Sequence, residues 1–283
     1  MNTSVLPFLP RIEGIEFVEY ATRQVDTFGA LLQAMGFVPV ARHRSRQVLL
    51  YRQGNMNVIL NAHPKAQHVP EGDGIELRAL GLRVPDAEQA YAHALACEAR
   101  PVTTRPGPME LNIPGIQGPG GAAVFLLDRR AGVAFYQVDF LPLPGVSFEV
   151  PALAGLHLFG VVQYIQRGAT ARWCDFFHQT LGFEPLPDDV RFGVMPRGAL
   201  MRSSDESFFL QFVEAPEGAE DAHWQEGFTR IGLGAPDVAA AVAVLEARGI
   251  QFVDASLLGG RDRGALTRSL EGGIQFELVH HQA

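Results

Sequence analysis

Scarcities in the sequence exclude several classes of protein. Its 283 residues include only two cysteines, Cys97 and Cys174, which excludes a disulfide-stabilised secreted domain. We expect both thiols to be small buried side chains in a reducing compartment. Lysines and arginines number 23 against 31 aspartates and glutamates, which gives a formal charge of −8. A chain with this charge and no basic stripe lacks the features of a nucleic-acid-binding protein, so we expect no nucleic-acid partner.

Long apolar runs are also lacking. No stretch approaches the ~20 consecutive apolar residues of a membrane-spanning helix. Residues 1–11 have neither the basic leader nor the apolar core of a secretory signal peptide. We therefore expect a cytoplasmic protein with no membrane partner, and the composition is compatible with an oligomer. What is present is the composition of a folded chain, 47% hydrophobic and 19% charged.

An internal repeat organises the chain. A strand-like run that begins at Gly14 leads to a helix-like segment that ends at Gly36. A second run that begins at Gly160 leads to a helix-like segment that ends at Gly182, and the two pairs of glycines have the same separation. The same order continues in two further pairs of motifs, residues 81–86 with 232–237 and Gly120 with Gly272. This conserved order within one chain indicates a duplication.

Within each half, the hydrophobic pattern alternates between the period of a strand and that of a helix. The strand-then-helix pairs are residues 17–20 with 28–35 and residues 161–164 with 171–181. Asp86 and Asp237 each stand where a side chain can accept the first free backbone N–H groups of a following helix. Shorter strands are expected at residues 48–51, 57–61, 193–195 and 207–213.

These alternations predict the α+β fold class. Each half reads as strand, helix and strands, followed by strand, helix and strands, which makes a pair of βαβββ modules whose sheet can curl into a cup. The proline-rich stretch 140–151 joins the halves, because proline removes backbone donors and favours an extended chain. We therefore place one domain at residues 1–145 and a second at residues 146–283.

Several runs in the N-terminal half closely resemble the N-terminal half of bacterial 4-hydroxyphenylpyruvate dioxygenases. They are GIEFVEYA at residues 14–21, MGF at 35–37, ARHRS at 41–45, LYRQG at 50–54, NVILN at 57–61 and GPMELNIPGI at 107–116. The C-terminal half resembles the family more faintly, through Gly160, Gly182-Phe183, Pro236-Asp237 and the last strand at residues 274–279. Family members continue past that strand into a C-terminal helix, whereas the printed sequence ends at Ala283. The resemblance implies two tandem vicinal-oxygen-chelate domains, the second being the family's active-site domain.

The resemblance also implies where a metal would bind. In the family, the C-terminal cup holds iron(II) on two histidines and one glutamate, which leaves open positions for a 2-oxo acid and dioxygen. Carried onto this sequence, the histidine positions fall on Gly160 and Arg230, and the glutamate position falls on Glu277. Glycine has no side-chain ligand and guanidinium has no lone pair to give a metal, so we expect no metal and no other cofactor. Iron(II) would be a cofactor only if the site were rearranged.

Three histidines could restore a metal ligand. His157 lies three residues before Gly160, and since strand side chains alternate between faces, we expect it to point away from the face that Gly160 occupies. His280 and His281 follow Glu277, and we expect both to be solvated. In the N-terminal half, the repeat places Gly14, Ala79 and Phe125 at the positions of Gly160, Arg230 and Glu277, which is no ligand triad.

Glu277, Arg230 and Gln211 are the candidate ligand-binding residues. Glu277 stands between two apolar residues of the last strand, as either an inward carboxylate or a solvated one. If Glu277 and Arg230 both point inward, their charges should meet in a salt bridge. That pair would either lock the cup shut or leave donors for an anionic ligand. Gln211, in an aromatic strand, either lines the same cup or points outward.

Two classes of function fit these residues. The leading hypothesis is a 4-hydroxyphenylpyruvate dioxygenase-like protein that has lost iron-dependent oxygenation and binds a small carboxylate or aromatic ligand in the C-terminal cup. The alternative is an enzyme. It would be either a dioxygenase with a rearranged metal site, or a metal-free lyase or isomerase in which Glu277 is the catalytic base and Arg230 holds the substrate anion.

Overall fold

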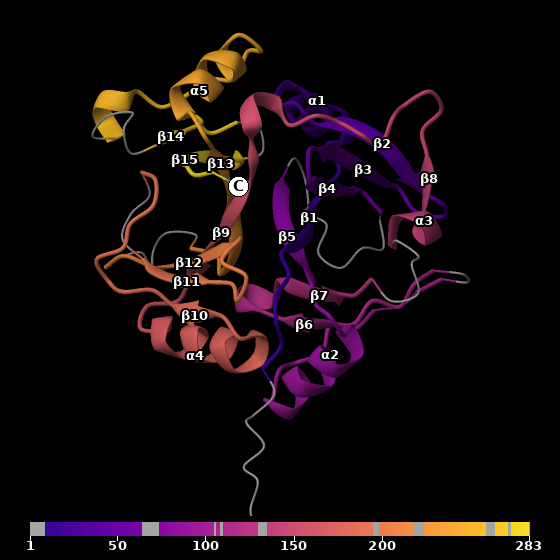
Figure 1. The fold of residues 1–283 in the computed structure, drawn as a ribbon, viewed down its shortest axis with the longest axis vertical. Coiled ribbons are helices and arrows are strands. Elements are labelled where there is room, and N and C mark those ends of the chain that lie inside the picture. The colour runs from indigo at the N-terminus through magenta and orange to yellow at the C-terminus, as the bar shows by residue number, and fades with distance from the viewer. Residues whose placement is uncertain are drawn as a thin grey trace, which may run out of the picture.

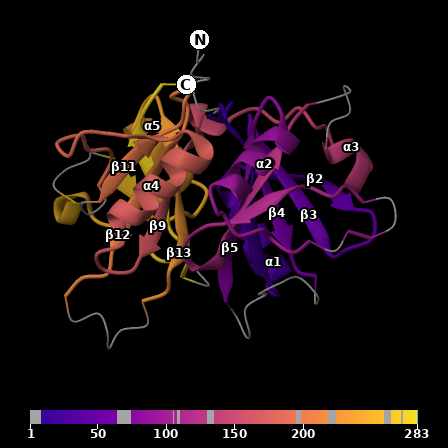
Figure 2. The same ribbon diagram turned by 90° about the horizontal axis from the view of Figure 1, so that it is seen from below.

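The computed structural model describes residues 9–63, 74–104, 106–107, 110–129, 135–194, 198–217, 224–258, 264–270 and 273–282. These residues form two mixed sheets with few helices, one sheet in each half of the chain (Figure 1). The halves lie side by side, and Figure 2 shows the same arrangement from below. Each half is therefore built as the repeat in the sequence predicts.

The N-terminal sheet has the strand order β6-β7-β5-β1-β4-β3-β2-β8. Its elements are β1 (Ile15–Thr22), α1 (Val25–Ala34), β2 (Val38–His43), β3 (Val48–Gln53), β4 (Met56–Asn61), β5 (Ile75–Arg83), α2 (Ala87–Ala96), β6 (Gly115–Gln117), η1 (Pro119–Gly121), β7 (Ala123–Leu127), α3 (Phe135–Asp139) and β8 (Phe140–Pro142). The predicted cap of α2 is confirmed, because the Asp86 side chain accepts a hydrogen bond from the backbone of Gln89 at 2.9 Å.

The C-terminal sheet has the strand order β10-β11-β12-β9-β13-β15-β14. Its elements are η3 (Leu153–Gly155), β9 (His157–Ile165), α4 (Thr170–Leu181), β10 (Glu184–Pro185), β11 (Ala199–Arg202), β12 (Phe209–Glu214), β13 (Gly227–Ala235), α5 (Val238–Glu246), η5 (Ala255–Leu258), β14 (Ala265–Leu266) and β15 (Phe276–His280). The cap of α5 is confirmed as well, since the Asp237 side chain accepts from the backbone of Ala240 at 2.9 Å.

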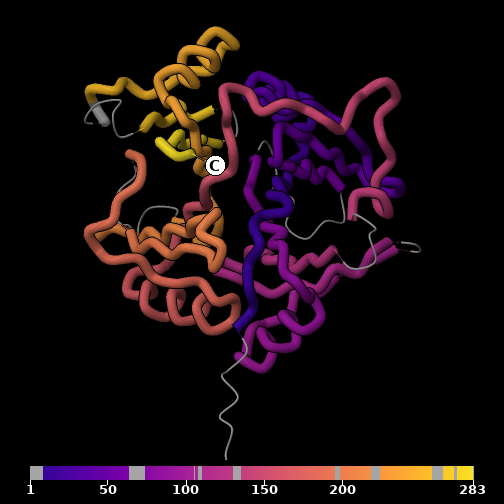
Figure 3. Tube along the Cα trace, viewed as in Figure 1, coloured from indigo at the N-terminus to yellow at the C-terminus, as the bar shows by residue number. Residues whose placement is uncertain are grey.

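Two local predictions are wrong. Gly193 and Val194 form a bend rather than a strand, because Gly193 has a φ of +61°, which an extended strand does not allow; Met195 lies outside the described residues. The stretch predicted as a linker begins inside the N-terminal sheet, where Phe140–Pro142 form β8 and pair with β2. The chain crosses to the other half after this strand and before β9, as the tube in Figure 3 shows.

Strand register confirms the repeat on one side of each sheet. On β5, Gly81 lies opposite Phe125 of the parallel strand β7. On β13, Gly232 lies opposite Glu277 of the parallel strand β15. Because the two glycines are equivalent in the repeat, Phe125 occupies the place of Glu277, as the sequence predicts.

On the other side of each sheet, the register corrects the predicted equivalence. The residue opposite Gly81 on β1 is Phe17, whereas the residue opposite Gly232 on β9 is Gly160. The predicted superposition of Gly14 on Gly160 is therefore wrong by three residues. Both antiparallel pairs contain register shifts, and such bulges displace a strand relative to its partner without changing the order of motifs.

Aromatic side chains fill the interior of the N-terminal cup. The rings of Phe17 and Phe135 stack with centroids 5.8 Å apart, and Phe125 lies 6.3 Å from Phe17. A Cβ atom on Gly81 would come within 2.5 Å of the Phe17 ring, so this glycine makes the close approach of the ring possible. The side chains of this cup belong to a separate apolar cluster with Leu50, Ile59 and Phe140.

The two halves touch closely at η1. Gly120 has a φ of +62°, and a Cβ atom there would lie 1.9 Å from the backbone carbonyl oxygen of Glu226. The helices also meet in pairs across the junction. His93 of α2 is within 2.8 Å of the carbonyl oxygen of Gln179 on α4, and Arg248, just after α5, donates to the carbonyl oxygen of Ala34 on α1.

The structure also bears on the expectations for the two cysteines and for membrane-spanning helices. Cys97 and Cys174 are free thiols, and both are half-buried rather than buried. None of the helices in the described part of the chain has the length and apolar character needed to cross a membrane.

Candidate functional site

Glu277 lies inside the C-terminal cup. Glu277 is only 3% exposed, which excludes a solvated carboxylate on the outer face of the strand. The carboxylate accepts a hydrogen bond from the backbone N–H of Val194 at 2.7 Å. Across the sheet, Glu277 lies beside Gly232, which in turn lies opposite Gly160. The carboxylate therefore faces two glycines on the neighbouring strands and is held by the backbone of the bend at Val194.

The cavity beside Glu277 is small. Its volume is about 30 Å³, which is close to the share of liquid volume taken by one water molecule. Gln211 lines this cavity together with Glu277, so the structure places it inside the cup rather than on the outer face. The other lining residues are Phe159, Gly160, Val161, Val162, Phe192, Leu200, Phe209, Gly232 and Val279.

Three phenylalanines account for the small volume. Phe159 on β9 stacks on Phe209 of β12, with centroids 4.8 Å apart and an interplanar angle of 28°. Phe192, which immediately precedes the bend at Gly193 and Val194, packs edge-on against Phe159 at 5.1 Å and lies 4.7 Å from Phe209. We call these three side chains the aromatic plug. All three rings of the plug line the cavity beside Glu277.

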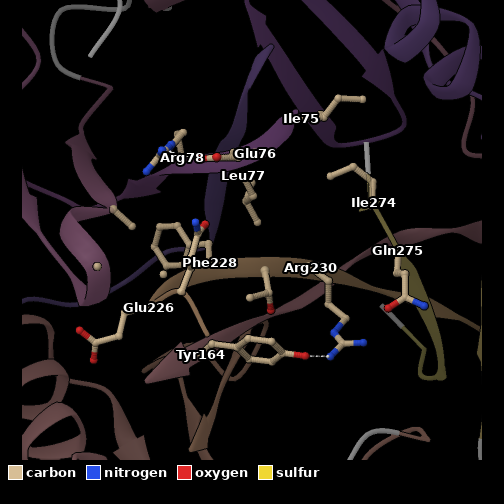
Figure 4. A pocket seen from close by; sticks show the side chains of 16 residues that line it. Ile75, Glu76, Leu77, Arg78, Tyr164, Glu226, Phe228, Arg230, Ile274 and Gln275 are labelled. Carbon is tan, nitrogen blue, oxygen red and sulfur yellow. Dashed lines mark hydrogen bonds and ion pairs between the residues drawn. The ribbon is translucent and has the colours of Figure 1, made fainter. Parts of the chain in front are cut away.

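Arg230 does not meet Glu277, and the predicted salt bridge is wrong. The Arg230 guanidinium donates to the hydroxyl of Tyr164 at 3.0 Å and lies 5.9 Å from the centre of the Tyr164 ring. Arg230 lies opposite Val162 in the sheet, two residues before Gly232 on the same strand. Arg230 therefore lies diagonal to Glu277 across β13 and β15, and its guanidinium is engaged by Tyr164 instead of the carboxylate. Figure 4 shows Arg230 directed toward Tyr164.

Because the two charges are not paired, Arg230→Met and Glu277→Gln should change the free energy of unfolding additively. The expected coupling energy is below about 0.5 kcal/mol, as for sites with no shared partner. Breaking a buried ion pair would instead cost ~3–5 kcal/mol in each single variant, with recovery in the double variant. Urea unfolding of the parent, both single variants and the double variant gives the coupling. A value above about 1 kcal/mol would contradict the separation of the two side chains.

The histidines near the cup form a pair. Nε2 of His157 lies 2.9 Å from Nδ1 of His281, so His281 is not the solvated residue that the sequence predicts. Burial, and then the neighbouring His157, lower the pKa of His281. His280 is exposed, as expected. The register places His157, not Gly160, at the position equivalent to Gly14.

These side chains do not fit a metal centre of three protein ligands. In the described ranges, no group of three or more histidines, cysteines, aspartates and glutamates lies close enough together to hold a metal ion. The His157–His281 pair supplies two imidazoles, but it directs them at each other. Glu277 supplies one carboxylate, and its strand neighbours Gly232 and Gly160 supply no side-chain donor.

Comparison with known proteins shows which dioxygenases the chain is similar to. A family model described as hydroxyphenylpyruvate dioxygenase, HPPD, N-terminal, matches residues 10–141. The 4-hydroxyphenylpyruvate dioxygenase of Pseudomonas sp. (strain P.J. 874) is 38% identical over 177 residues, which are 61% of this chain and 49% of that protein. The protein of the same name from Pseudomonas aeruginosa is 28% identical over 262 residues, 85% of this chain and 71% of that protein. The chain is a 4-hydroxyphenylpyruvate dioxygenase-like protein of the vicinal-oxygen-chelate superfamily.

Solved structures agree on the fold of this dioxygenase-like chain. A xylose isomerase-like TIM barrel/4-hydroxyphenylpyruvate dioxygenase fusion protein aligns with a TM-score of 0.78 and 23% identity, over 100% of this chain and 52% of its own. At that identity, the likeness shows the fold alone. The predicted α+β vicinal-oxygen-chelate fold in two halves is confirmed. The matches span about half the length of the Pseudomonas sp. relative and of the fusion protein.

Two site residues of the dioxygenase-like chain had no role in the sequence-based interpretation. Tyr164 could have been found, because alternation along β9 places it on the same face as Gly160 and Val162. Phe192 could not, because it stands in an irregular segment with no strand or helix periodicity, and only the fold brings it against Phe159.

Proposed function

We propose that this 4-hydroxyphenylpyruvate dioxygenase-like chain has lost iron-dependent oxygenation and binds a small carboxylate or aromatic ligand. The observation that supports this proposal is the surroundings of Glu277. The carboxylate lies in line with Gly232 and with Gly160, one of the two positions where the resemblance places a histidine, and it accepts a hydrogen bond from the backbone of Val194. The other position is occupied by Arg230, which contacts Tyr164 instead of Glu277. A cavity of about 30 Å³ admits neither a 2-oxo acid nor dioxygen together with a metal.

The same surroundings count against Glu277 as a catalytic base. A general base must come within hydrogen-bond reach of the proton that it removes. With the aromatic plug in place, the cup leaves space for about one water molecule beside the carboxylate, so a substrate of the family's size has no route to it. We therefore favour a chain that binds its ligand away from Glu277 over a metal-free lyase or isomerase that uses Glu277 as its base.

The test of the proposed loss is an oxygenation assay. The full chain is purified without metal, incubated with iron(II), and desalted, and its iron content and its oxygen uptake with 4-hydroxyphenylpyruvate are measured. We expect no retained iron at one equivalent and no oxygen uptake above a protein-free blank. The 4-hydroxyphenylpyruvate dioxygenase of Pseudomonas aeruginosa, treated in parallel, is the positive control.

Oxygen uptake by the parent would overturn the proposal if the Glu277→Gln variant lost it. That result would assign Glu277 to a working metal site and direct attention to His157 and His281 as the missing ligands, since the His281 ring packs on Phe159 of the cup and pairs with His157. Uptake that survives both Glu277→Gln and His157→Gln would instead indicate a contaminating oxygenase, and the preparation would be repeated from a host lacking one.

A further inference from the structure

A second, larger cavity lies at the junction of the two halves. Its volume is about 310 Å³, at the lower end of the range for small-molecule sites. The N-terminal half contributes Ile75 and Leu77 from β5, and the C-terminal half contributes Phe228 and Arg230 from β13 and Tyr164 from β9. Figure 4 shows the two walls facing each other, with Arg230 and Tyr164 joined on one of them.

Arg230 lines this cavity as a buried cation without a carboxylate partner among the described residues. Arg230 is 6% exposed, and its Nε atom has no hydrogen-bond partner. Its hydrogen bond from Nη2 goes to the hydroxyl of Tyr164, which is not a carboxylate. A guanidinium carries five N–H donors, and the described residues accept a hydrogen bond from only one of its three nitrogen atoms. A buried charge is costly unless an opposite charge and hydrogen bonds compensate it. The side chain is therefore short of one anion.

The other charged side chains of the cavity are already engaged. Arg78 pairs with Glu76 on the same strand, and both are partly exposed. Glu226 accepts a hydrogen bond from the backbone of Gln166 at 2.9 Å. Neither carboxylate lies within salt-bridge distance of Arg230. The salt bridges between described residues are all formed by other arginines. An anion for Arg230 would have to come from outside the chain.

The rest of the lining selects the body of such an anion. Four apolar side chains, Ile75, Leu77, Phe228 and Ile274, stand among polar ones in the lining, such as Thr229 and Gln275. A planar guanidinium with two N–H groups side by side matches a carboxylate in a bidentate manner. We propose that the junction cavity binds a small carboxylate with an apolar, ring-sized body, and that Arg230 binds its carboxylate group. This inference rests on the proposed function for the kind of ligand, but it moves the ligand from the cup to the junction.

Titration calorimetry with benzoate tests the proposal. Benzamide, which has the same ring and shape but no charge, is the matched ligand control. We expect benzoate to bind the full chain and benzamide to bind at least tenfold more weakly. Arg230→Met should weaken benzoate binding by about 10- to 100-fold, the loss that accompanies a hydrogen-bonded charged partner. Arg172→Met, at an exposed arginine of α4 whose cation stacks on Trp173, should leave binding unchanged.

Thermal melts separate loss of the site from loss of the fold. Without ligand, Arg230→Met should melt no lower than the parent, because it replaces an uncompensated buried cation with an apolar side chain of similar length. Benzoate should raise the melting temperature of the parent and of Arg172→Met, but not that of Arg230→Met. A variant that melts far below the parent would be replaced by Arg230→Gln, which keeps a donor to Tyr164 and removes the charge.

Two results would overturn the inference. One is the absence of benzoate binding to the parent at millimolar concentration. The other is benzoate binding that Arg230→Met leaves intact while Gln211→Leu weakens it, which would place the ligand in the cup beside Glu277. That second result would leave the proposed function standing, whereas oxygen uptake with 4-hydroxyphenylpyruvate would overturn the proposed function without deciding where benzoate binds.

Discussion

Gly120→Ala should lower the free energy of unfolding by about 3 kcal/mol or more, from an overpacked contact and a left-handed backbone. A Cβ atom at this position would stand 1.9 Å from the carbonyl oxygen of Glu226. That oxygen belongs to backbone, so no rotation of a side chain relieves the clash, and the two halves must move apart. Urea unfolding followed by far-UV circular dichroism measures the loss.

Gly121→Ala is the matched control. Gly121 also has a positive φ, +76°, but a Cβ atom there would meet nothing within 4 Å. Its substitution should cost only the strain of the left-handed backbone, roughly 1–2 kcal/mol. Equal losses in the two variants would mean that the halves separate freely at Gly120, and the junction would then be a loose contact rather than a fixed one.

Phe159→Ala should destabilise the chain by ~3–5 kcal/mol, the usual cost of removing a buried phenylalanine ring. Phe159 is 5% exposed and contacts both Phe209 and Phe192, so its loss leaves a gap at the centre of the aromatic plug. Leu95→Ala on α2 is the control, because Leu95 is 39% exposed and its removal should change stability by less than about 0.5 kcal/mol. Chemical unfolding of the three proteins gives both numbers.

A loss below about 1 kcal/mol for Phe159→Ala would contradict the description of the cup as filled. It would show that the plug leaves the cup at little cost in solution. The carboxylate of Glu277 would then be open to ligands, and the original hypothesis of binding in the C-terminal cup would regain its support.

The parts of the fold that depend on local sequence could be predicted. Asp86 and Asp237 cap their helices as expected, because a cap is decided by the few residues around it. The equivalence of Phe125 with Glu277 also followed from motif order. Phe125 lies opposite Gly81 and Glu277 lies opposite Gly232, and these two glycines open corresponding motifs of the repeat. Predictions of this kind need no knowledge of how distant strands are aligned.

The site was less predictable, because it depends on register. Arg230 and Glu277 share a face, as the resemblance implied, but the register places them one side-chain pair apart along the sheet. The equivalence of Gly14 and Gly160 failed for a similar reason, since bulges shifted the strands by amounts that motif spacing does not reveal. The pairing of His157 with His281 joins residues from opposite ends of the half, which no local pattern indicates.

Rings lie against glycines in both copies of the repeat, Phe17 at Gly81 and Phe159 at Gly232. The interior of each half is therefore filled by its own side chains. Of the two cavities described above, the larger is lined by residues from both halves. If the junction cavity holds a guest, the smallest unit able to recognise it is the whole tandem, and separating the copies would abolish recognition even where each copy kept its fold.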